Sequence, residues 1–383
     1  MTQYILTLNA GSSSIKFALF DNARNLAECV RGQVEGLGAT PRLEAEAGGT
    51  KFLDQAIGSA EATDHSSALA VILKLLEHRL GKISVAAVGH RIVHGGMDFN
   101  EAIVLDDDKL ATLARLNPLA PLHQPHNLSA VRAAQAAFPA ALQVACFDTA
   151  FHRSHPFVND VFALPRKYYD EGLRRYGFHG LSYEYVSTKL RQISPLHAQG
   201  RVVVAHLGNG ASMCAIRDGL SVASSMGFTP LDGLPMGTRC GQLDPGVLLY
   251  LMQEKKMSVD AIADLLYRES GLKGLSGISN DMRELEASDR PEAQQAIEYF
   301  VFRIRRELGG LAAELEGLDA MVFCGGIGEH AWRMRERVLE GMGWIGIELD
   351  RSANRGSEQV ISSERSRVRV FVIPTDEEAM IAR

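Results

Sequence analysis

The sequence lacks the features of several classes of protein. Its 383 residues include only five cysteines, which are scattered and never form a Cys-x-x-Cys pair. This usage argues against a disulfide framework and a structural zinc site, and it favours a reducing compartment, which we expect to be the cytoplasm. The first residues have no basic region ahead of an apolar stretch, and no run of about 18 apolar residues occurs, so neither secretion nor membrane spanning is expected.

The chain also lacks an excess of positive charge. Lys and Arg number 40 against 46 Asp and Glu, which leaves a net charge of -6. The overall field therefore repels nucleic acid and anionic membranes, and any phosphate binding must be local. A hydrophobic fraction of 46% and a mean hydropathy of -0.04 are typical of a globular protein, and the length predicts two domains or three.

Short apolar runs alternate with amphipathic helices, which predicts an α/β protein. The runs are bounded by Gly, Pro, Asn or Asp, as buried strands are, and they lie at 4–8, 85–88, 142–147, 202–205, 321–323 and 368–373. Apolar residues at helical spacing predict helices from Ser66 to a stop at Gly81, from about Pro245, from Ser258, and from Pro291 through Leu311. We expect residues 48–49 and 352–367 to be surface segments.

One pattern occurs twice in the chain. Residues 5–20 predict a strand, a turn of small residues and a returning strand, and residues 203–216 repeat that order. The repetition predicts a duplicated domain whose two hairpin loops face a shared cleft. Neither loop is a Walker A sequence and no Gly-x-Gly-x-x-Gly opens a helix at the first turn, which excludes the P-loop and Rossmann folds.

The backbone N–H groups of these loops can nevertheless bind phosphate oxygens. Further contacts are available from Ser12, Ser14, Lys16 and Asn209. A tight hairpin without a ligand explains either loop alone equally well. A third Gly-rich element, residues 325–328, is expected to be a turn between a strand and a helix from Ala331 to Met342, where glycine lets a base or a phosphate approach the backbone.

Acidic residues follow two of the predicted strands. Asp148 comes directly after 142–147, and residues 376–378 follow 368–374. Open α/β sheets bind ligands at the carboxyl ends of their strands, and Mg²⁺ prefers one or two carboxylates together with substrate phosphates. We therefore expect Asp148 and Glu377 to serve magnesium from opposite sides of the cleft, although helix capping is the commoner role for such a residue taken alone.

Arginine and histidine supply the remaining candidates. Arg91 follows a predicted strand and Arg239 lies among glycines on a predicted loop, so their guanidinium forks can bind a carboxylate and a phosphoryl group. His90 and His94 have the spacing of zinc-protease ligands but lack that motif's glutamate, so packing or hydrogen bonding is favoured for them. The same holds for His123, His126, His152 and His155. His179 follows Gly177-Phe178 and precedes Gly180, and it is a better candidate for a functional donor.

Together these motifs resemble those of acetate kinases, within the acetate and sugar kinase, heat-shock chaperone and actin superfamily. The resemblance covers almost the whole chain and rests on segments in the family's order: 9–16, 89–96, 147–152, 176–180, 206–210, 236–239 and 325–329. It implies a duplicated actin-like (ribonuclease H-like) two-domain α/β fold with an interdomain nucleotide cleft. The implied domains are 1–149 completed by 377–383, and 150–376. The resemblance also implies a homodimer.

The resemblance further implies reversible, Mg-assisted, direct in-line transfer of the ATP γ-phosphoryl group to acetate. ATP is the co-substrate, and the metal is Mg²⁺ with Mn²⁺ as an alternative. The implied partners are a small carboxylate and a nucleotide, with neither nucleic acid nor membrane. The implied catalytic residues are Asp148, His179, Arg239 and Arg91, of which His179 and Arg239 stabilise the transition state. The implied metal contacts are Asn9 and Glu377.

Two binding sets are implied in the same way. Arg91 holds the carboxylate, and the acceptor pocket contains Val93, Leu122, His123, Phe178 and Pro230. The ATP contacts are Ser12, Ser14, Lys16, His206, Leu207, Gly208, Asn209, Gly210, Asp281, Met282, Arg283, Gly326, Ile327, Gly328, Glu329 and His330. Because acetate is already an anion, the reaction needs no strong base, and Asp148 is interpreted as orienting metal-bound water.

The chain departs from the family pattern at several positions. Gln242 replaces an acid, and Asp376 and His330 each replace an asparagine, while Gln124 and His126 alter the setting of His123. A propionate or butyrate kinase remains an alternative, since one methylene is worth only about 1–3 kcal/mol of discrimination. An actin-like ATPase switch, without an acceptor, is the alternative from another class. A metallohydrolase rests only on the scattered histidines.

Overall fold

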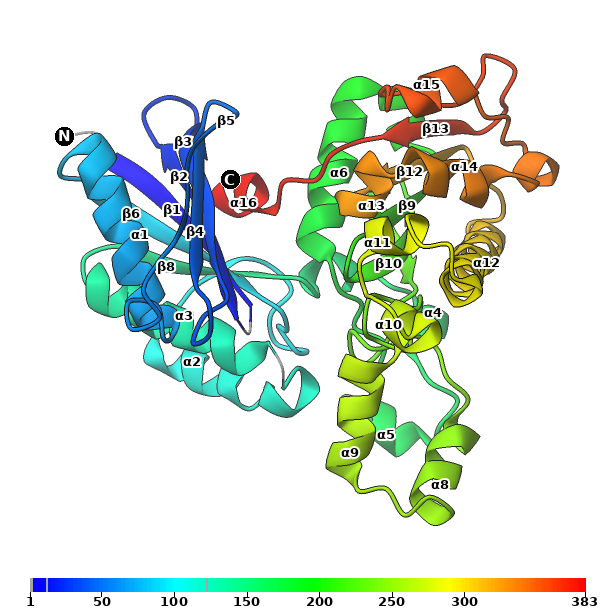
Figure 1. Ribbon diagram of the computed structural model, residues 1–383, viewed down its shortest axis with the longest axis horizontal. Coiled ribbons are helices and arrows are strands. Elements are labelled where there is room, and N and C mark those ends of the chain that lie inside the picture. The colour runs from blue at the N-terminus through cyan, green and yellow to red at the C-terminus, as the bar shows by residue number, and fades with distance from the viewer. Residues whose placement is uncertain (1–2, 12, 122) are drawn as a thin grey trace. The chain divides into compact units, whose positions relative to one another are not determined.

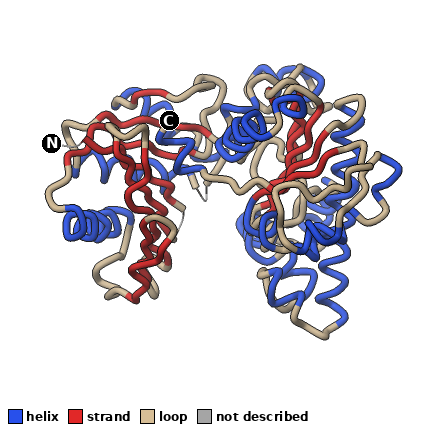
Figure 2. The backbone as a smooth tube through the Cα atoms, turned by 90° about the horizontal axis from the view of Figure 1, so that it is seen from above, coloured by secondary structure: helices blue, strands red, loops and turns tan. Residues whose placement is uncertain are grey.

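The computed structural model describes residues 3–11, 13–121 and 123–383, which form two compact units. The first unit contains residues 1–151 and 376–383, and the second contains 152–375. Each unit has its own mixed sheet with helices beside it (Figure 2). This arrangement confirms the predicted α/β class, and the domain limits expected from the sequence stay a prediction.

The first unit is built on a sheet with the order β5-β4-β3-β2-β1-β6-β8-β7. Its strands are β1 (Gln3–Ala10), β2 (Ser14–Asp21), β3 (Ala27–Glu35), β4 (Arg42–Ala47), β5 (Thr50–Ala56), β6 (Ser84–Ile92), β7 (Ile103–Val104) and β8 (Leu142–Phe147). Its helices are α1 (His65–Leu80), α2 (Asp107–Ala114), α3 (Gln124–Ala137) and α16 (Glu377–Ala382).

The two faces of this sheet carry different helices. Leu8 and Phe17 point to the face where Ile72 of α1 is buried, in a core that also includes residues of α3. On the opposite face Phe20 packs with Ala382 of α16, and Figure 1 shows α1 and α16 on opposite sides of the sheet. Helix α16 lies so close to β6 that a Cβ on Gly89 would come within 2.5 Å of the side chain of Ile381, so only glycine fits there.

The second unit is built on a sheet with the order β11-β10-β9-β12-β13. Its strands are β9 (Arg201–Leu207), β10 (Ala211–Arg217), β11 (Leu220–Ser224), β12 (Ala320–Cys324) and β13 (Arg369–Val372). Its helices are α4 (Phe157–Asp160), α5 (Arg166–Asp170), α6 (Gly180–Ile193), α7 (Pro195–Ala198), α8 (Pro245–Gln253), α9 (Val259–Asp264), α10 (Gly271–Ser276), α11 (Met282–Glu286), α12 (Pro291–Glu314), α13 (Gly325–His330), α14 (Trp332–Leu339) and α15 (Arg351–Arg355). Within the described ranges, no helix is both long and apolar enough to span a bilayer.

The two sheets repeat one topology, which confirms the predicted duplication. In the first unit β1 pairs antiparallel with β2 and parallel with β6, and β6 pairs parallel with β8. In the second unit β9 pairs antiparallel with β10 and parallel with β12, and β12 pairs parallel with β13. The two predicted hairpins are therefore the β1–β2 and β9–β10 turns at the centre of each sheet.

The expectation for the third Gly-rich element is wrong in detail. Helix α13 begins at Gly325, directly after β12, and a separate helix α14 follows from Trp332 to Leu339. Gly325 has a φ of 75°, and a Cβ there would lie 2.8 Å from the carbonyl oxygen of Leu207. A side chain at this position is sterically excluded, so a glycine makes the immediate strand-to-helix transition possible.

Residues 352–367, expected at the surface, are partly buried. Arg335 of α14 is fully buried, and its guanidinium donates to the side-chain and backbone oxygens of Asn354 at 2.8 and 2.9 Å. The same guanidinium donates to the carbonyl oxygens of Gly328 and Glu329 at the end of α13. One buried cation therefore holds α15 against the unit and satisfies the last carbonyls of α13.

Candidate active site

Four polar side chains of the first unit converge at one edge of the sheet. Asn9 lies near the end of β1, Arg91 near the end of the parallel strand β6, and Asp148 directly after β8. Glu377 is the first residue of α16, which packs on β1, β2 and β6. The parallel direction of β1, β6 and β8 therefore brings together residues that are far apart in the chain.

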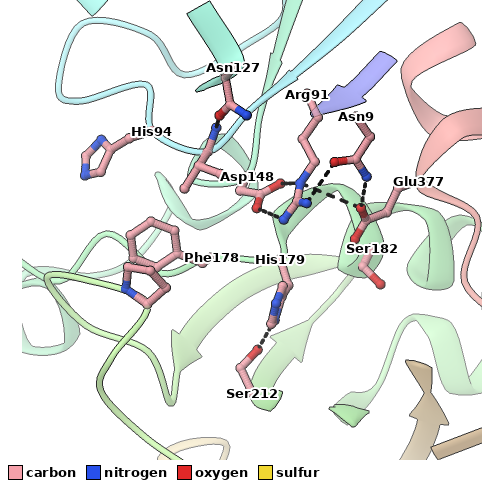
Figure 3. Close-up of polar contacts among 12 residues, drawn as sticks. Asn9, Arg91, His94, Asn127, Asp148, Phe178, His179, Ser182, Ser212 and Glu377 are labelled. Atoms are coloured by element: carbon pink, nitrogen blue, oxygen red, sulfur yellow. Dashed lines mark hydrogen bonds and ion pairs between the residues drawn. The ribbon is translucent and has the colours of Figure 1, made fainter. Parts of the chain in front are cut away.

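Arg91 is the centre of this cluster (Figure 3). Its Nε and Nη2 donate to Oδ1 and Oδ2 of Asp148 at 2.9 and 2.5 Å, and its Nη1 donates to Oδ1 of Asn9 at 3.0 Å. Nδ2 of Asn9 in turn donates to Oε2 of Glu377 at 3.2 Å, and that oxygen lies 3.7 Å from Nε of Arg91. The expectation that Asp148 and Glu377 lie on opposite sides of a cleft is therefore wrong.

The charges in the cluster do not cancel. Burial disfavours the charged guanidinium, but the carboxylates of Asp148 and then Glu377 outweigh it and raise the pKa of Arg91. One guanidinium against two carboxylates leaves one net negative charge. Hard oxygen atoms with that residual charge suit a divalent cation that keeps most of its coordination for water and substrate phosphates. Among the described residues, no cluster of three or more His, Cys, Asp or Glu forms a closed metal site.

Helix capping is the alternative role for Asp148 and Glu377, but Asp376 is the residue that caps α16. Asp376 is the N-cap of α16 and accepts a hydrogen bond from the backbone N–H of Ala379 at 2.9 Å. Asp148 accepts from Arg91 instead and is only 1% exposed.

Of the residues expected for the acceptor pocket, some belong to the first unit and some to the second. Val93 is buried in the first unit, where His123 precedes α3, whereas Phe178 and Pro230 are buried in the second unit. Leu122, like Ser12 of the nucleotide set, lies outside the described residues.

Two buried amides lie near Val93: Gln124, which the sequence marked only as altering the setting of His123, and Asn127, which it did not single out. Asn127 accepts from the backbone N–H of Val93 and donates to the carbonyl of Ala10, at 3.0 and 2.6 Å. Gln124 accepts from the N–H and donates to the carbonyl of His94, at 3.1 and 3.0 Å. Their three-residue spacing on α3 puts both on one face of that helix, which is the signal that could have identified them.

In the second unit, His179 lies at the start of α6 with its ring held on both sides. Its Nδ1 is 2.8 Å from Oγ of Ser212, as Figure 3 shows, and its ring stacks on His206 with centroids 4.3 Å apart. The ring nitrogen Nδ1 is thus engaged by the protein. The other nitrogen, Nε2, is directed toward the β9–β10 turn.

The side chains of His179 and Arg239 meet beside the β9–β10 turn. A Cβ built on Gly210 would lie 3.4 Å from Nε2 of His179 and 3.5 Å from Nη2 of Arg239. Arg239 is held in place because its Nη1 donates to the carbonyl oxygen of Pro230 at 2.8 Å. The structure therefore brings both predicted transition-state stabilisers to the predicted phosphate loop, residues 206–210.

A pocket of about 590 Å³ adjoins the same loop. It is lined by Gly208, Asn209, Asn280, Asp281, Met282, Arg283, Glu286, Gly326, Ile327, His330 and Ala331. Asn280, which the sequence did not single out, donates from Nδ2 to Oδ1 of Asn209 at 3.2 Å. The pocket is large enough for a small-molecule ligand, and glycine lets a ligand approach its backbone wall.

Some predicted nucleotide contacts lie elsewhere in the structure. Oε1 of Glu329 accepts from the backbone N–H groups of Gly325 and Thr375, at 2.8 and 3.1 Å, so this oxygen stabilises the fold. Gly328 faces the backbone of Phe323 and Ala205. Ser14 and Lys16 belong to the first unit, where Lys16 lines a smaller cavity of about 220 Å³ beside Glu378. Burial and then the charge of Glu377 raise the pKa of Glu378, and Lys16 lowers it.

The sequence model of the acetokinase family matches residues 4–383 of this chain. The chain belongs to the acetokinase family. It is 65% identical over 392 residues to a protein named acetate kinase from Methylocella silvestris, with 100% of this chain and 97% of that protein covered. A second relative, named acetate kinase from Nitrobacter hamburgensis, is 53% identical, with 99% of this chain and 94% of that protein covered.

Solved structures of this family share the fold. The acetate kinase structure from Porphyromonas gingivalis matches with a TM-score of 0.89 at 38% identity, and a propionate kinase structure from Francisella tularensis matches with 0.92 at 37%. Each match covers 99% of this chain and 98% of the other. These matches confirm the duplicated actin-like fold that the sequence predicts for this acetokinase-family chain.

Proposed function

We propose that this enzyme of the acetokinase family transfers the γ-phosphoryl group of ATP to acetate, reversibly, giving acetyl phosphate and ADP. The observation that carries the proposal is the approach of Nε2 of His179 and Nη2 of Arg239 to Gly210 in the predicted phosphate loop. Preorganised donors of this kind stabilise the charge that develops on a transferring phosphoryl group.

The nucleotide binds in the pocket between residues 281–283 and the start of α13. Gly326 lets the base or ribose lie against backbone, and Asn209 and Gly210 bring N–H groups to the phosphates. The γ-phosphoryl group then lies beside Nε2 of His179 and Nη2 of Arg239. These contacts hold the group in line for attack.

The acetate carboxylate is bound by Arg91 in the first unit. The guanidinium of Arg91 also pairs with Asp148. The Arg91 side chain is partly exposed, and its Nη1 donates to Asn9. The acetate oxygen attacks as an anion, so no proton has to be removed. Asp148 stays ionised and holds the guanidinium in position.

Mg²⁺, with Mn²⁺ as an alternative, would be held by Glu377 and Asn9, with Asp148 orienting the surrounding water. These residues fit a hard divalent cation because they present oxygen atoms and one uncompensated negative charge. When bound there, such an ion would neutralise negative charge on the ATP phosphates.

Propionate kinase activity is the second candidate. The observation that supports it is the match to the propionate kinase structure from Francisella tularensis. The two acceptors differ by one methylene, which a closed apolar pocket distinguishes by about 1–3 kcal/mol. We place acetate first because relatives that match 100% and 99% of this chain, at 65% and 53% identity, are named acetate kinase.

The test is a hydroxamate trap for acyl phosphate, with ATP, Mg²⁺ and acetate, propionate or butyrate in parallel reactions. We expect acetate to give the highest kcat/KM. Formation of ADP without acceptor and without acyl phosphate would favour the actin-like ATPase switch and refute the kinase proposal. The preferred acceptor among the three acids decides between acetate and propionate.

The proposal includes a homodimer acting in the cytoplasm. Helix α8 is strongly apolar yet has no buried residue, and Leu249 and Tyr250 on it are 53% and 51% exposed, so a second copy is the expected cover. Leu249→Glu should then yield monomers in sedimentation velocity, whereas an unchanged mass would refute this interface. No disulfide joins any of the five cysteines, all of which lie in the described ranges, and this supports a reducing compartment.

A further inference from the structure

The loop that carries Phe178 and His179 has an unfavourable backbone. Gly177 has a φ of 73°, and His179 has a φ of 60° with a ψ of 24°. The left-handed region is disfavoured for residues other than glycine, because Cβ then approaches the following carbonyl oxygen. His179 keeps this conformation only if surrounding contacts hold it there.

His152 makes two of those contacts. Its side chain is fully buried, and its Nε2 lies 2.9 Å from the carbonyl oxygen of Phe178. Its ring also fills the space beside Gly177, where a Cβ would come within 2.6 Å of the ring carbons. One imidazole thus packs on the residue before Phe178 and bonds to the peptide group that joins Phe178 to His179.

The carbonyl group of Phe178 fixes the direction of the hydrogen bonds that His152 makes. A carbonyl oxygen only accepts, so Nε2 of His152 carries the proton. Burial lowers the pKa of His152 to about 4, although the bond to Phe178 opposes this, so the ring is neutral near pH 7 and its Nδ1 accepts. The hydroxyl of Ser221, 2.8 Å away, therefore donates to Nδ1. Nε2 of His155, also 2.8 Å from that hydroxyl oxygen, donates to it.

This chain of bonds ends on the central sheet of the second unit. Ser221 lies on β11, and Sγ of Cys214 on β10 is 3.2 Å from its Oγ. Ser212, which contacts the ring of His179, lies two residues before Cys214, so both side chains leave β10 on the same face. The ring of His179 is therefore held by β10 through Ser212, and the backbone before His179 is connected to β10 through His152, Ser221 and Cys214.

We propose that His152 is a positioning residue for phosphoryl transfer: through Gly177 and the carbonyl of Phe178 it holds His179 in the orientation that brings Nε2 to Gly210. The proposal rests on the proposed function, in which His179 acts on the transferring group. His152 itself touches neither substrate. Ser221 and His155 set the tautomer with which it acts.

The test compares His152→Phe, which keeps the ring but loses both nitrogens, with His152→Gln, whose amide can donate to Phe178 and accept from Ser221. We expect His152→Phe to lower kcat about 100-fold while KM for ATP changes less than about twofold, because a displaced catalytic group affects the chemical step. His152→Gln should recover activity to within about fivefold of wild type. His197→Phe, on α7 of the same unit, is the matched control and should behave as wild type.

A double-mutant cycle with His179→Ala separates positioning from general destabilisation. If His152 acts through His179, the His152→Phe, His179→Ala double variant should be no slower than His179→Ala alone. Additive losses, or an unchanged kcat in His152→Phe, would overturn the proposal. Should the Phe variant not fold, Ser221→Ala is carried through the same cycle, with a fall in kcat of about threefold expected and additivity again decisive.

Amide hydrogen exchange of the peptide that covers residues 176–180 gives a readout independent of activity. Exchange should be faster in His152→Phe than in wild type and unchanged in His197→Phe. If wild-type enzyme forms no acyl phosphate, the proposed function fails while this measurement still tests whether His152 holds the loop. Unchanged exchange in His152→Phe would refute the positioning role even in an active kinase.

Discussion

Asp148 and Arg91 form a two-point ion pair, with both carboxylate oxygens of Asp148 accepting from the guanidinium at 2.9 and 2.5 Å. Asp148 is almost fully buried and Arg91 is partly exposed, so the pair lies at the inner edge of the cluster. The adjacent guanidinium favours the charged form of this carboxylate. In the proposed reaction we therefore expect Asp148 to act by charge and by orientation, and not by carrying a proton.

Asp148→Asn should lower kcat by about two orders of magnitude and shift the Mg²⁺ requirement to higher concentration, since it removes the net negative charge of the cluster. The measurement is a Mg²⁺ titration of acetyl phosphate formation. Asp319→Asn is the matched control. Asp319 makes the same kind of two-point pair, accepting from Nε and Nη2 of Arg201 at 2.9 and 2.6 Å, but both residues belong to the second unit and are not part of the Arg91 cluster. A wild-type titration in Asp148→Asn would return this residue to a purely structural role.

Arg91→Ala and Arg239→Ala should both impair turnover but in different ways. Loss of Arg91 removes ground-state binding of the carboxylate and should mainly raise KM for acetate, whereas loss of Arg239 should mainly lower kcat, since it acts on the transferring phosphoryl group. Initial rates over a grid of acetate and ATP concentrations separate the two effects. Arg201→Ala serves as the control, and equal effects of the two substitutions on both parameters would contradict the assigned roles.

His330 should weaken discrimination between purine bases. Its side chain is 81% exposed and lines the pocket proposed for the nucleotide. Imidazole can stack on a purine but lacks the paired donor and acceptor of an asparagine amide, so GTP or ITP should support the reaction within about tenfold of ATP. His330→Asn should raise the ratio of kcat/KM for ATP over GTP, with His197→Asn as control. An unchanged ratio in His330→Asn would mean that this side chain does not read the base.

Gln242→Glu should stabilise the second unit. Arg303 on α12 is only 5% exposed, and the groups that accept its hydrogen bonds are neutral: Oε1 of Gln242 at 2.9 Å, the carbonyl of Gly233 and the hydroxyl of Tyr299. A carboxylate of the same size makes a charge-assisted bond, and we expect the free energy of unfolding to rise by about 1 kcal/mol.

Urea unfolding followed by tryptophan fluorescence measures this change, because Trp332 and Trp344, the two tryptophans of the chain, both lie in the second unit. Gln253→Glu, at the end of α8, introduces the same charge without reaching Arg303 and serves as the control. A lower or equal stability of Gln242→Glu would contradict the expected ion pair.

The first unit should lose stability as the pH falls from about 6.5 toward 4. Burial lowers the pKa of His90 to about 4, partly opposed by its bond to Gln143, whereas in the unfolded chain it lies near 6.5. Between these values the unfolded state binds a proton that the folded state does not, so the free energy of unfolding falls with falling pH. At pH 5 the loss from this residue is about 2 kcal/mol.

His90→Gln removes the titrating group and should flatten this pH dependence by that amount. Hydrogen exchange of peptides from β6 and β8, compared at pH 7 and pH 5 after correction for intrinsic rates, reports the stability of this unit. The exposed residue His78 provides the control, His78→Gln, which should keep the wild-type pH dependence. The same dependence in His90→Gln as in wild type would show that other groups govern it.

Local signals in the sequence were sufficient for the elements whose ends are set by neighbouring residues. Helix α1 ends at Leu80, directly before the predicted stop at Gly81, and it begins at His65, one residue before the expected start at Ser66. The repeated hairpin and the ordered family motifs likewise depend on short stretches of chain, so the α/β class, the duplication and the family could be read without coordinates. Helix α13 escaped the prediction because its start depends on the close backbone of Leu207, which lies far away in sequence.

Sequence alone also named Asn9, Arg91, Asp148, Glu377, His179 and Arg239 as candidates, because their motifs resemble those of a known family. Only the tertiary structure decided which of them meet. Asn9 and Glu377 are 368 residues apart, and Arg91 and Asp148 are 57 apart. Their contacts arise from the parallel order of β1, β6 and β8 and from the packing of α16 on Gly89. Such pairings depend on how strands align across a sheet, and no local propensity in the chain encodes that alignment.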